Sequence, residues 1–390
     1  MKVLAIAPLG ATHLSAMFPT CWALRLAGHD VLVACSPDLA SAVHGAGLPS
    51  VEIGAAEAVM NQISSDTSAD WFPVPQFGER DTEMGRYLWT TAAAPQVTYA
   101  NERFADYLAF ARSWQPDLLL HDPTALIGRL LGGVLDLPSV AHRWGVDPTA
   151  GPFEEAVQRD LAPLYTSYGL TELPAPQLIL DPCPPALQVA DAPRGEHIAY
   201  VPFNGTGSVP DWVREPTGRR RVCVCMGSTV LEVAGVKSLR AVIDALADAD
   251  DLDVVLAVTA NYRSKLGEIP DRFRVVESLP LSLFLDTCSA IVDAGGSGTG
   301  LTAVTMGIPQ LVLPQWFDQF DFAAGLVASG AGTSLVTPAE QADLDRIRDG
   351  LRAVLDDPSY LTAAEQLRAD WEKTALPLPH VVPMLEKLVR

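Results

Sequence analysis

The stretch DAGGSGTG, residues 293–300, places small and hydroxyl-bearing residues directly after an apolar run, CSAIV. Glycines let backbone amides approach an anion closely, and hydroxyl groups add further hydrogen-bond donors. If a helix begins here, the positive end of its dipole also favours negative charge. The stretch therefore predicts a diphosphate site, with a ligand-free tight turn as the alternative, formed by Gly295, Gly296, Ser297, Gly298 and Thr299.

A second loop, MGST, follows the apolar run RRRVCVC and adds Gly227, Ser228 and Thr229 to the predicted diphosphate site. Neither loop carries the Gly-Lys-Ser/Thr sequence of a P-loop. The G-x-G-x-x-G motif that would follow the first strand of a nicotinamide-binding domain is also missing. The two loops therefore argue for a phosphate ligand of another kind.

Asp318 and Gln319 follow the apolar run LVLP in the segment LVLPQWFDQFD. A carboxylate beside a carboxamide can hydrogen-bond vicinal hydroxyl groups in a forked arrangement. The alternative is a helix N-cap with its neighbour. Because this pair and the glycine loop come at consecutive strand ends, we expect them to face one ligand, a phosphate joined to a sugar.

His13 comes shortly after the first apolar run of the chain, KVLAIAPLG. A free imidazole titrates near pH 6.5 and can therefore accept a proton at neutral pH. Its target would be a hydroxyl group, or a phenol with a pKa near 10. The alternative is a loop histidine that faces solvent.

These residues need a scaffold that brings strand ends together. Short apolar strands alternate with helices along the chain, which is typical of parallel sheets with helical crossovers. The pattern predicts two Rossmann-like, doubly wound α/β domains that face each other across a cleft: residues 1–205, a linker over 206–218, and residues 219–390 with helices at the end. In such sheets ligands bind outside the carboxyl ends of the strands.

Individual elements can be predicted within this scheme. The expected strands cover 2–9, 31–36, 116–122, 138–144, 219–228, 254–259, 272–277, 289–293 and 309–313, and the expected helices lie near 15–27, 96–113, 235–248, 281–288, 298–306 and 319–329. Residues 55–85 are polar and rich in proline and aromatic residues, which predicts a long mobile loop over a functional face. Residues 145–218 are proline-rich and are expected to be irregular.

Composition narrows the possible partners of this 390-residue chain. A formal net charge of −20 argues against nucleic acid and anionic membranes as partners. No apolar segment is long enough to cross a bilayer, and the N-terminal run is too short for a signal peptide. Six cysteines without a C-x-x-C pair predict buried thiols in a reducing cytoplasm, with zinc or a disulfide at Cys223 and Cys225 as the alternative.

As a set, three segments resemble the family 1 glycosyltransferases of the GT-B fold: AGGSGT, FDQFDFA and the N-terminal PLGATHLSAMFPTCWALRLAGHDVLVA. The segments HRWGVDPTAGPF, ILDPCPP and QWFDQFD resemble the bacterial enzymes that decorate aromatic polyketides such as angucyclines and anthracyclines, close to the urdamycin- and landomycin-type olivosyltransferases. The resemblance spans nearly the whole chain. It implies acceptor binding by the first domain and donor binding by the second.

The resemblance also implies roles for individual residues. His13 matches the general base of the family, and Asp122, after PDLLLH, matches an aspartate that steadies it. Asp136 in VLDLP is a second acidic candidate, although either aspartate could instead cap or end a helix. Leu279 and Leu281 stand where the family holds the nucleobase, chiefly through backbone contacts, and their side chains could equally belong to the core.

The acceptor site of such an enzyme would be lined by aromatic side chains that stack on a flat aglycone. The chain offers one cation and several aromatic candidates for this site, with core packing as the alternative: Arg143, Trp71, Phe72, Phe77, Trp89 and Trp144.

The expected activity is inverting transfer of a deoxysugar from a thymidine-diphosphate donor to an aromatic polyketide aglycone, through oxygen or carbon, without a metal or a cofactor. Two alternatives stay open: a nucleotide-sugar 2-epimerase of the same architecture, and an inactive, nucleotide-binding auxiliary partner. The long aromatic loop argues against the first, and the presence of His13 with Asp318 and Gln319 argues against the second. The sequence leaves the oligomeric state open, and a homodimer is one of the possible forms.

Overall fold

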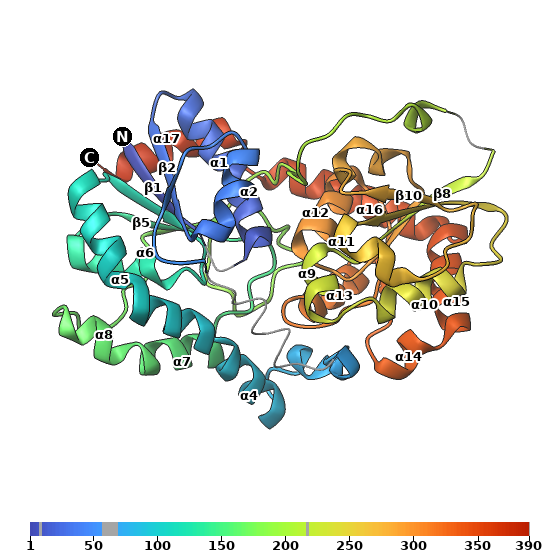
Figure 1. Cartoon of the computed structure of the whole chain (residues 1–390), viewed down its shortest axis with the longest axis horizontal. Coiled ribbons are helices and arrows are strands. Elements are labelled where there is room, and N and C mark those ends of the chain that lie inside the picture. The colour runs from blue at the N-terminus through green and yellow to red at the C-terminus, as the bar shows by residue number, and fades with distance from the viewer. Residues whose placement is uncertain (8–9, 57–68, 216–217, 390) are drawn as a thin grey trace.

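Two lobes, each built on a parallel sheet, form the molecule (Figure 1). The computed structural model describes residues 1–7, 10–56, 69–215 and 218–389. The first sheet has seven strands in the order β3-β2-β1-β4-β5-β6-β7, and the second has six in the order β10-β9-β8-β11-β12-β13. Every strand pairing in both sheets is parallel, so the predicted class of two Rossmann-like domains is confirmed.

The first domain contains these strands: β1 (Lys2–Ile6), β2 (Asp30–Cys35), β3 (Ser50–Glu52), β4 (Leu118–His121), β5 (Ser139–His142), β6 (Leu178–Asp181) and β7 (Glu196–His197). Its helices are α1 (Ala11–Leu26), α2 (Ala40–Gly45), α4 (Glu83–Ala92), α5 (Ala94–Trp114), α6 (Leu126–Leu135), α7 (Pro152–Asp160) and α8 (Ala162–Ser167).

The second domain contains β8 (Arg220–Cys225), β9 (Leu252–Val258), β10 (Arg274–Glu277), β11 (Ala290–Asp293), β12 (Gln310–Val312) and β13 (Gly332–Ser334). The helices after β8 are α9 (Ser228–Val233), α10 (Lys237–Ala245), α11 (Ala260–Arg263), α12 (Ser297–Met306), α13 (Gln319–Ala328), α14 (Pro338–Ala342), α15 (Leu344–Asp356), α16 (Pro358–Thr374) and α17 (Leu378–Leu388).

Both faces of each sheet are buried, which explains the nearly continuous apolar strands. Successive side chains of a strand point to opposite faces, so Val3 and Ala5 of β1 join one core cluster while Leu4 and Ile6 join another. Helices cover both faces, as parallel sheets require.

The strand register brings the predicted loops to one edge in each domain. In the second sheet Asp293, the last residue of β11, pairs with Cys225 at the end of β8 and with Val312 at the end of β12. In the first sheet Ile6 of β1 pairs with His121 of β4. The loops that follow these strands therefore emerge side by side.

Some elements differ from the prediction. The region over 145–218 contains α7, α8, β6 and β7, because its prolines stand at helix starts and in the turns between these elements. Residues 281–288 form two short 3-10 turns rather than one helix. Helix α1 begins at Ala11, so His13 lies in its first turn rather than in a loop.

The end of the chain does not stay with the second domain. Leu378, Val381, Val382 and Leu385 of α17 are buried in the core cluster that contains β1 and α1, and Figure 1 shows α17 beside α1 on the first lobe. The expected division at 219–390 is therefore wrong for this last helix, whose apolar face completes the first domain.

A segment of the first domain crosses to the second. Phe72 is buried in the main core cluster of the second domain, and the Val74 amide donates a 2.8 Å hydrogen bond to the Gln315 carbonyl. Farther along, the Arg80 guanidinium lies 3.9 Å from the Asp321 carboxylate. We call residues 69–80 the bridging segment. Residues 57–68 of the predicted mobile loop lie outside the described residues.

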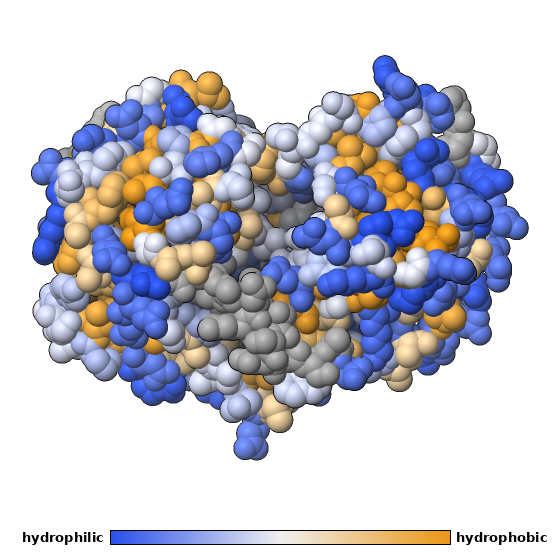
Figure 2. Space-filling view, in the orientation of Figure 1, coloured by the Kyte–Doolittle hydropathy of each residue, from blue (hydrophilic) through white to orange (hydrophobic). Residues whose placement is uncertain are grey.

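The two lobes leave a hollow between them on the face shown in Figure 2. None of the helices in the described part of the chain is long and apolar enough to span a membrane.

Candidate functional site

His13 and Asp122 meet at the carboxyl edge of the first sheet. The Nδ1 atom of His13 lies 3.3 Å from Oδ2 of Asp122, whose side chain is fully buried. The other oxygen, Oδ1, accepts hydrogen bonds from the Thr124 amide at 2.8 Å and from its hydroxyl at 2.5 Å. Because Thr124 holds the carboxylate in place, the second oxygen stays directed toward the imidazole. The predicted pairing of these two residues is thus present in the geometry.

The surroundings of His13 favour a strong base. Burial opposes the charged imidazolium, but the carboxylates of Asp122, Asp318 and Asp147 outweigh it and raise the pKa of His13 above its ordinary value of 6.5. The side chain keeps 22% of its surface exposed, so a substrate hydroxyl can reach it. A proton taken up by His13 is therefore stabilised by acidic groups from both domains.

The two predicted diphosphate loops lie next to each other in the second domain. Gly227 is the N-cap of α9, with φ of 79°, and a Cβ placed on it would lie 3.9 Å from the Thr299 hydroxyl. Gly296 is the N-cap of α12. Two helix starts with glycine and hydroxyl residues thus converge on one place, as an anion site requires.

Asp293 shapes the glycine loop from below. Its Oδ1 accepts a 2.5 Å hydrogen bond from the Gly295 amide, which holds Gly295 at φ of 74°, a conformation that favours glycine. The amides of Gly295 and Thr299 therefore have partners inside the protein. Those of Gly296, Ser297 and Gly298 have no acceptor among the described residues and remain for a ligand.

Asp293 is also an unusual carboxyl group. Its Oδ2 atom is buried and has no hydrogen-bond partner within the described residues. Burial raises the pKa of Asp293 to about 7, although the bond from Gly295 works in the opposite direction. The sequence reasoning missed this residue, because it reads as the last position of a strand.

Asp318 lies where the two domains meet. Its Oδ2 accepts hydrogen bonds from the indole Nε1 of Trp144, at 2.9 Å, and from the Ser297 hydroxyl, at 3.1 Å. Both contacts use the same oxygen, Oδ2, and leave Oδ1 without either of these bonds. Gln319 uses its Oε1 to accept the Gln315 amide at 2.9 Å, which leaves its Nε2 as the donor available to a ligand.

The two domains pack tightly against each other at Gly145. A Cβ placed on Gly145 would lie 2.2 Å from the Ser297 hydroxyl oxygen and 2.5 Å from the Ser297 Cβ. Only a residue without a side chain fits there. The loop after β5 of the first domain thus packs directly on the glycine loop of the second, and the predicted base and the predicted donor loops share one site.

The predicted acceptor role of Arg143 is wrong. Its guanidinium is buried and forms ion pairs with Asp147 at 2.8 Å and Asp181 at 2.6 Å, and it donates to the Pro193 carbonyl at 2.6 Å. All three partners lie in the first domain, and they occupy the guanidinium group that was expected to contact the acceptor. Its role is to hold together the loops that follow β5 and β6.

Asp136 is not part of the site. It is exposed and forms the left-handed C-cap of α6, with φ of 52°. Since β5 begins three residues later, at Ser139, Asp136 lies at the amino edge of the sheet, opposite the loops that carry His13 and Asp122. The expected catalytic role of Asp136 is therefore wrong, and the alternative that it ends a helix is confirmed.

The aromatic candidates do not assemble into an open acceptor surface. Phe77 is buried between Trp89 and Phe317 in edge-on contacts, and Phe72 is buried in the second domain. Trp144 is also buried, with 3% of its surface exposed. Trp71 is exposed, but it belongs to the bridging segment. The prediction failed for the buried residues because their apolar surface closes the contact between domains.

Leu279 and Leu281 pack in the second domain. Leu281 is buried in a core cluster, and Leu279 packs against the same cluster. A nucleobase role through their backbone stays a prediction.

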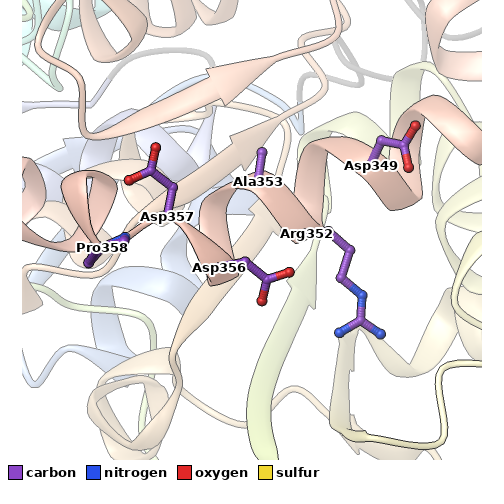
Figure 3. Close-up of a pocket in the computed structure, with 6 residues that line it drawn as sticks. All are labelled: Asp349, Arg352, Ala353, Asp356, Asp357 and Pro358. Atoms are coloured by element: carbon purple, nitrogen blue, oxygen red, sulfur yellow. The ribbon is translucent and has the colours of Figure 1, made fainter.

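The surface hollow in Figure 3 is not part of this site. It is lined by residues of α15 and the start of α16: Asp349, Arg352, Ala353, Asp356, Asp357 and Pro358. Arg352 forms a paired contact with Asp251, just before β9, and Asp356 pairs with Arg220 at the start of β8. The hollow therefore lies at the amino edge of the second sheet, opposite the glycine loops.

All six cysteines are free thiols. Among the described residues, no group of three or more His, Cys, Asp or Glu side chains is arranged to hold a metal ion.

Comparison with known proteins gives a consistent family. Residues 22–227 match the N-terminal domain of the family described as erythromycin biosynthesis protein CIII-like, and residues 240–388 match its C-terminal domain. A 10-deoxymethynolide desosaminyltransferase of Streptomyces venezuelae is 32% identical, with 100% of this chain and 97% of that protein covered. An aclacinomycin-T 2-deoxy-L-fucose transferase of Streptomyces galilaeus is also 32% identical, with 100% and 96% covered.

Solved structures agree with these relatives. A spinosyn rhamnosyltransferase, SpnG, complexed with thymidine diphosphate is 45% identical and superposes with a TM-score of 0.92, covering 99% of this chain and 100% of that one. The glycosyltransferase VinC in complex with dTDP is 28% identical with a TM-score of 0.80, covering 100% and 99%. The epimerase alternative receives no support from these relatives. This chain is a glycosyltransferase of the GT-B fold and belongs to the erythromycin biosynthesis protein CIII-like family.

Proposed function

We propose that this protein transfers a deoxysugar from a thymidine-diphosphate donor to a hydroxylated polyketide aglycone in antibiotic biosynthesis, with inversion at the anomeric carbon. The observation that carries the proposal is the meeting of two sets of residues at one place. His13 with Asp122 comes from the first domain, and Asp318 with the glycine loop comes from the second.

Each group has a defined task in this mechanism. His13 accepts the proton of the acceptor nucleophile through Nε2 while its Nδ1 faces Asp122. The oxygen or carbon nucleophile then attacks the anomeric carbon from the face opposite the diphosphate. The bond from that carbon to the diphosphate oxygen breaks, and the negative charge passes to thymidine diphosphate. The free amides of the glycine loop stabilise this charge.

The sugar lies between these two ends. Oδ1 of Asp318 and Nε2 of Gln319 bind its hydroxyl groups, since the other oxygens of both side chains are already used. The nucleobase lies near Leu279 and Leu281. Closure of the two domains excludes water, which would otherwise compete as the nucleophile.

The donor class is supported by relatives whose names include thymidine diphosphate and deoxysugars. The relatives define the acceptor class less narrowly than the donor class. The aclacinomycin relative supports the aromatic, anthracycline-like acceptor that the sequence motifs suggest. The spinosyn rhamnosyltransferase, at higher identity, supports a spinosyn-like aglycone. The assay must therefore offer both.

We further propose that the reaction needs no metal or cofactor and that it takes place in the cytoplasm. The only binding partners proposed are the donor and the acceptor. Whether the protein is a monomer or a homodimer stays open. Free thiols at all six cysteines are compatible with that compartment. An inactive auxiliary partner would have no need of a base paired with a buried carboxylate, so the His13–Asp122 contact argues against that alternative.

The test compares the wild type with His13→Ala in transfer from a thymidine-diphosphate deoxysugar to spinosyn aglycone and to an anthracycline aglycone. General-base removal should lower kcat by about 10²- to 10⁴-fold, while thymidine diphosphate still binds. His44→Ala is the matched control, because His44 is exposed and its Nε2 lies 2.9 Å from the Ser50 hydroxyl, outside the proposed site. The anomeric configuration of the product, read by NMR, tests inversion. Unchanged turnover in His13→Ala would refute the proposed base.

A further inference from the structure

Trp144 contacts both halves of the proposed site. Its ring stacks on His13 with the ring centroids 4.1 Å apart and the planes 9° from parallel. Its indole Nε1 donates the 2.9 Å hydrogen bond to Asp318. One side chain of the first domain thus touches the proposed base through its face and the proposed sugar-binding carboxylate through its edge. We propose that Trp144 is a positioning residue that sets the ring of His13 and the carboxylate of Asp318 in register across the domain boundary.

The backbone that carries Trp144 is held firmly on both sides. Before it, Arg143 is locked by Asp147, Asp181 and the Pro193 carbonyl, and its amide donates to the Leu180 carbonyl at 2.9 Å. After it, Gly145 packs on Ser297. This support fixes the indole well enough to orient its neighbours.

His13 needs contacts on both its edge and its face to be oriented. Asp122 contacts Nδ1 at the edge, which leaves rotation about that contact free. The indole face removes this freedom by stacking. An electron-rich ring also stabilises the charged imidazolium beside it. The charged groups that face His13 are Asp122, Asp318 and Asp147, so Trp144 acts together with these carboxylates.

Asp318 gains its orientation in the same way. The bonds from Trp144 and Ser297 both end on Oδ2, so they turn Oδ1 toward the remaining space. Burial raises the pKa of Asp318, and the bond from Trp144 opposes that rise. The indole therefore helps to keep Asp318 as the carboxylate that a sugar hydroxyl needs.

Two substitutions separate the two contacts. Trp144→Phe keeps an aromatic face on His13 but removes the N–H donor to Asp318. It should lower kcat/KM for the donor by about 10-fold or more, as for a lost hydrogen bond to a charged group. It should move the pH at which kcat reaches half its maximum less than Trp144→Leu does, because His13 keeps an aromatic face. Trp144→Leu removes both contacts. It should lower kcat by about 100-fold and move that half-maximal pH to a lower value, because the imidazolium loses its aromatic partner.

The control is Trp371→Phe. Trp371 is a buried indole whose Nε1 has no partner among the described residues, and it packs in α16 rather than at the site. It should leave kcat, KM and the pH profile unchanged. Thermal unfolding and thymidine diphosphate binding, measured for every variant, report any loss of fold. If Trp144→Leu does not fold, Trp144→Phe still tests the contact with Asp318.

The inference rests on the proposed function, and the outcomes keep the two apart. If His13→Ala retains turnover, the proposed base is wrong, whatever Trp144 does. If His13→Ala loses turnover but both Trp144 variants keep the wild-type kcat, donor KM and pH profile, the positioning role alone is overturned. The split between a donor effect in Trp144→Phe and a larger pH effect in Trp144→Leu is the result that supports it.

Discussion

Gly145→Ala should act as a wedge between the two domains. The added Cβ would lie 2.2 Å from the Ser297 hydroxyl oxygen, more than 1 Å short of ordinary contact at 3.4 Å. Gly145 does not have a positive φ, so the backbone tolerates alanine. Ser297 is buried and bonded to Asp318, so it cannot rotate away without breaking that bond. The strain must therefore separate the loop after β5 from the glycine loop.

The size of the effect follows from this displacement. A shift of about 1 Å between reacting groups costs on the order of 100-fold in rate, which corresponds to about 2.7 kcal/mol. We expect Gly145→Ala to lower kcat/KM by about that factor. Affinity for thymidine diphosphate should change much less, because the loops of the second domain remain intact. Steady-state transfer kinetics and calorimetric titration with thymidine diphosphate measure the two quantities.

Two further variants make the test specific. Gly45→Ala is the matched control, because a Cβ there meets nothing within 4 Å, and its kinetics should equal those of the wild type. Ser297→Gly removes both clashing atoms, so combining it with Gly145→Ala should restore part of the activity relative to the product of the two single losses. If Gly145→Ala keeps kcat/KM within about two-fold of wild type, Gly145 and Ser297 are not in contact during catalysis.

Three further predictions concern pH and stability. Burial lowers the pKa of His13, but the carboxylates, Asp122 first, raise it overall. Wild-type kcat/KM should therefore rise with pH through a value above 6.5, and Asp122→Asn should move this rise to lower pH. A pH profile of Asp122→Asn that equals the wild-type profile would contradict the pairing of His13 with Asp122. Phe72→Ala should lower the free energy of unfolding by about 3–5 kcal/mol, because this side chain is buried in the other domain; denaturant unfolding measures it, and a loss below about 1 kcal/mol would contradict the burial. Burial raises the pKa of Asp293 from 3.8 to about 7 in the native protein, so this group makes the free energy of unfolding fall as pH rises between these values. Asp293→Asn should flatten that fall in urea unfolding measured at a series of pH values. An unchanged dependence on pH would refute the assignment.

The sequence predicted best what depends on local patterns. The glycine loop, the strand before it and the helix after it are adjacent in the chain, so their residue types are sufficient to predict the helix start that the structure shows at Ser297. The anion site at that helix start stays a prediction. The pairing of His13 with Asp122 was predicted from the family resemblance. The fold explains it, because both residues follow strands of one parallel sheet whose carboxyl ends meet at one edge.

Contacts between the two domains could not be predicted from the sequence. Arg143 and Trp144 stand together after a strand, and nothing in the local sequence shows that one faces inward to Asp181 while the other reaches Asp318. Aromatic residues of the bridging segment, such as Phe72, looked like an acceptor surface because burial against a distant segment leaves no periodic signal. The acidity of Asp136 suggested a catalytic role, although its local sequence, VLDLP, also fits the end of a helix, which is where the structure places it.

Thymidine diphosphate binding is the measurement to make first. Thermal unfolding is recorded without ligand and with thymidine diphosphate, uridine diphosphate or NAD at the same concentration. A ligand at 100 times its dissociation constant adds about 2.7 kcal/mol to the stability of the folded state, which is readily seen in the unfolding midpoint. We expect thymidine diphosphate to raise the midpoint most. A midpoint raised only by uridine diphosphate or NAD, or by no ligand, would contradict a thymidine-diphosphate site at the glycine loop.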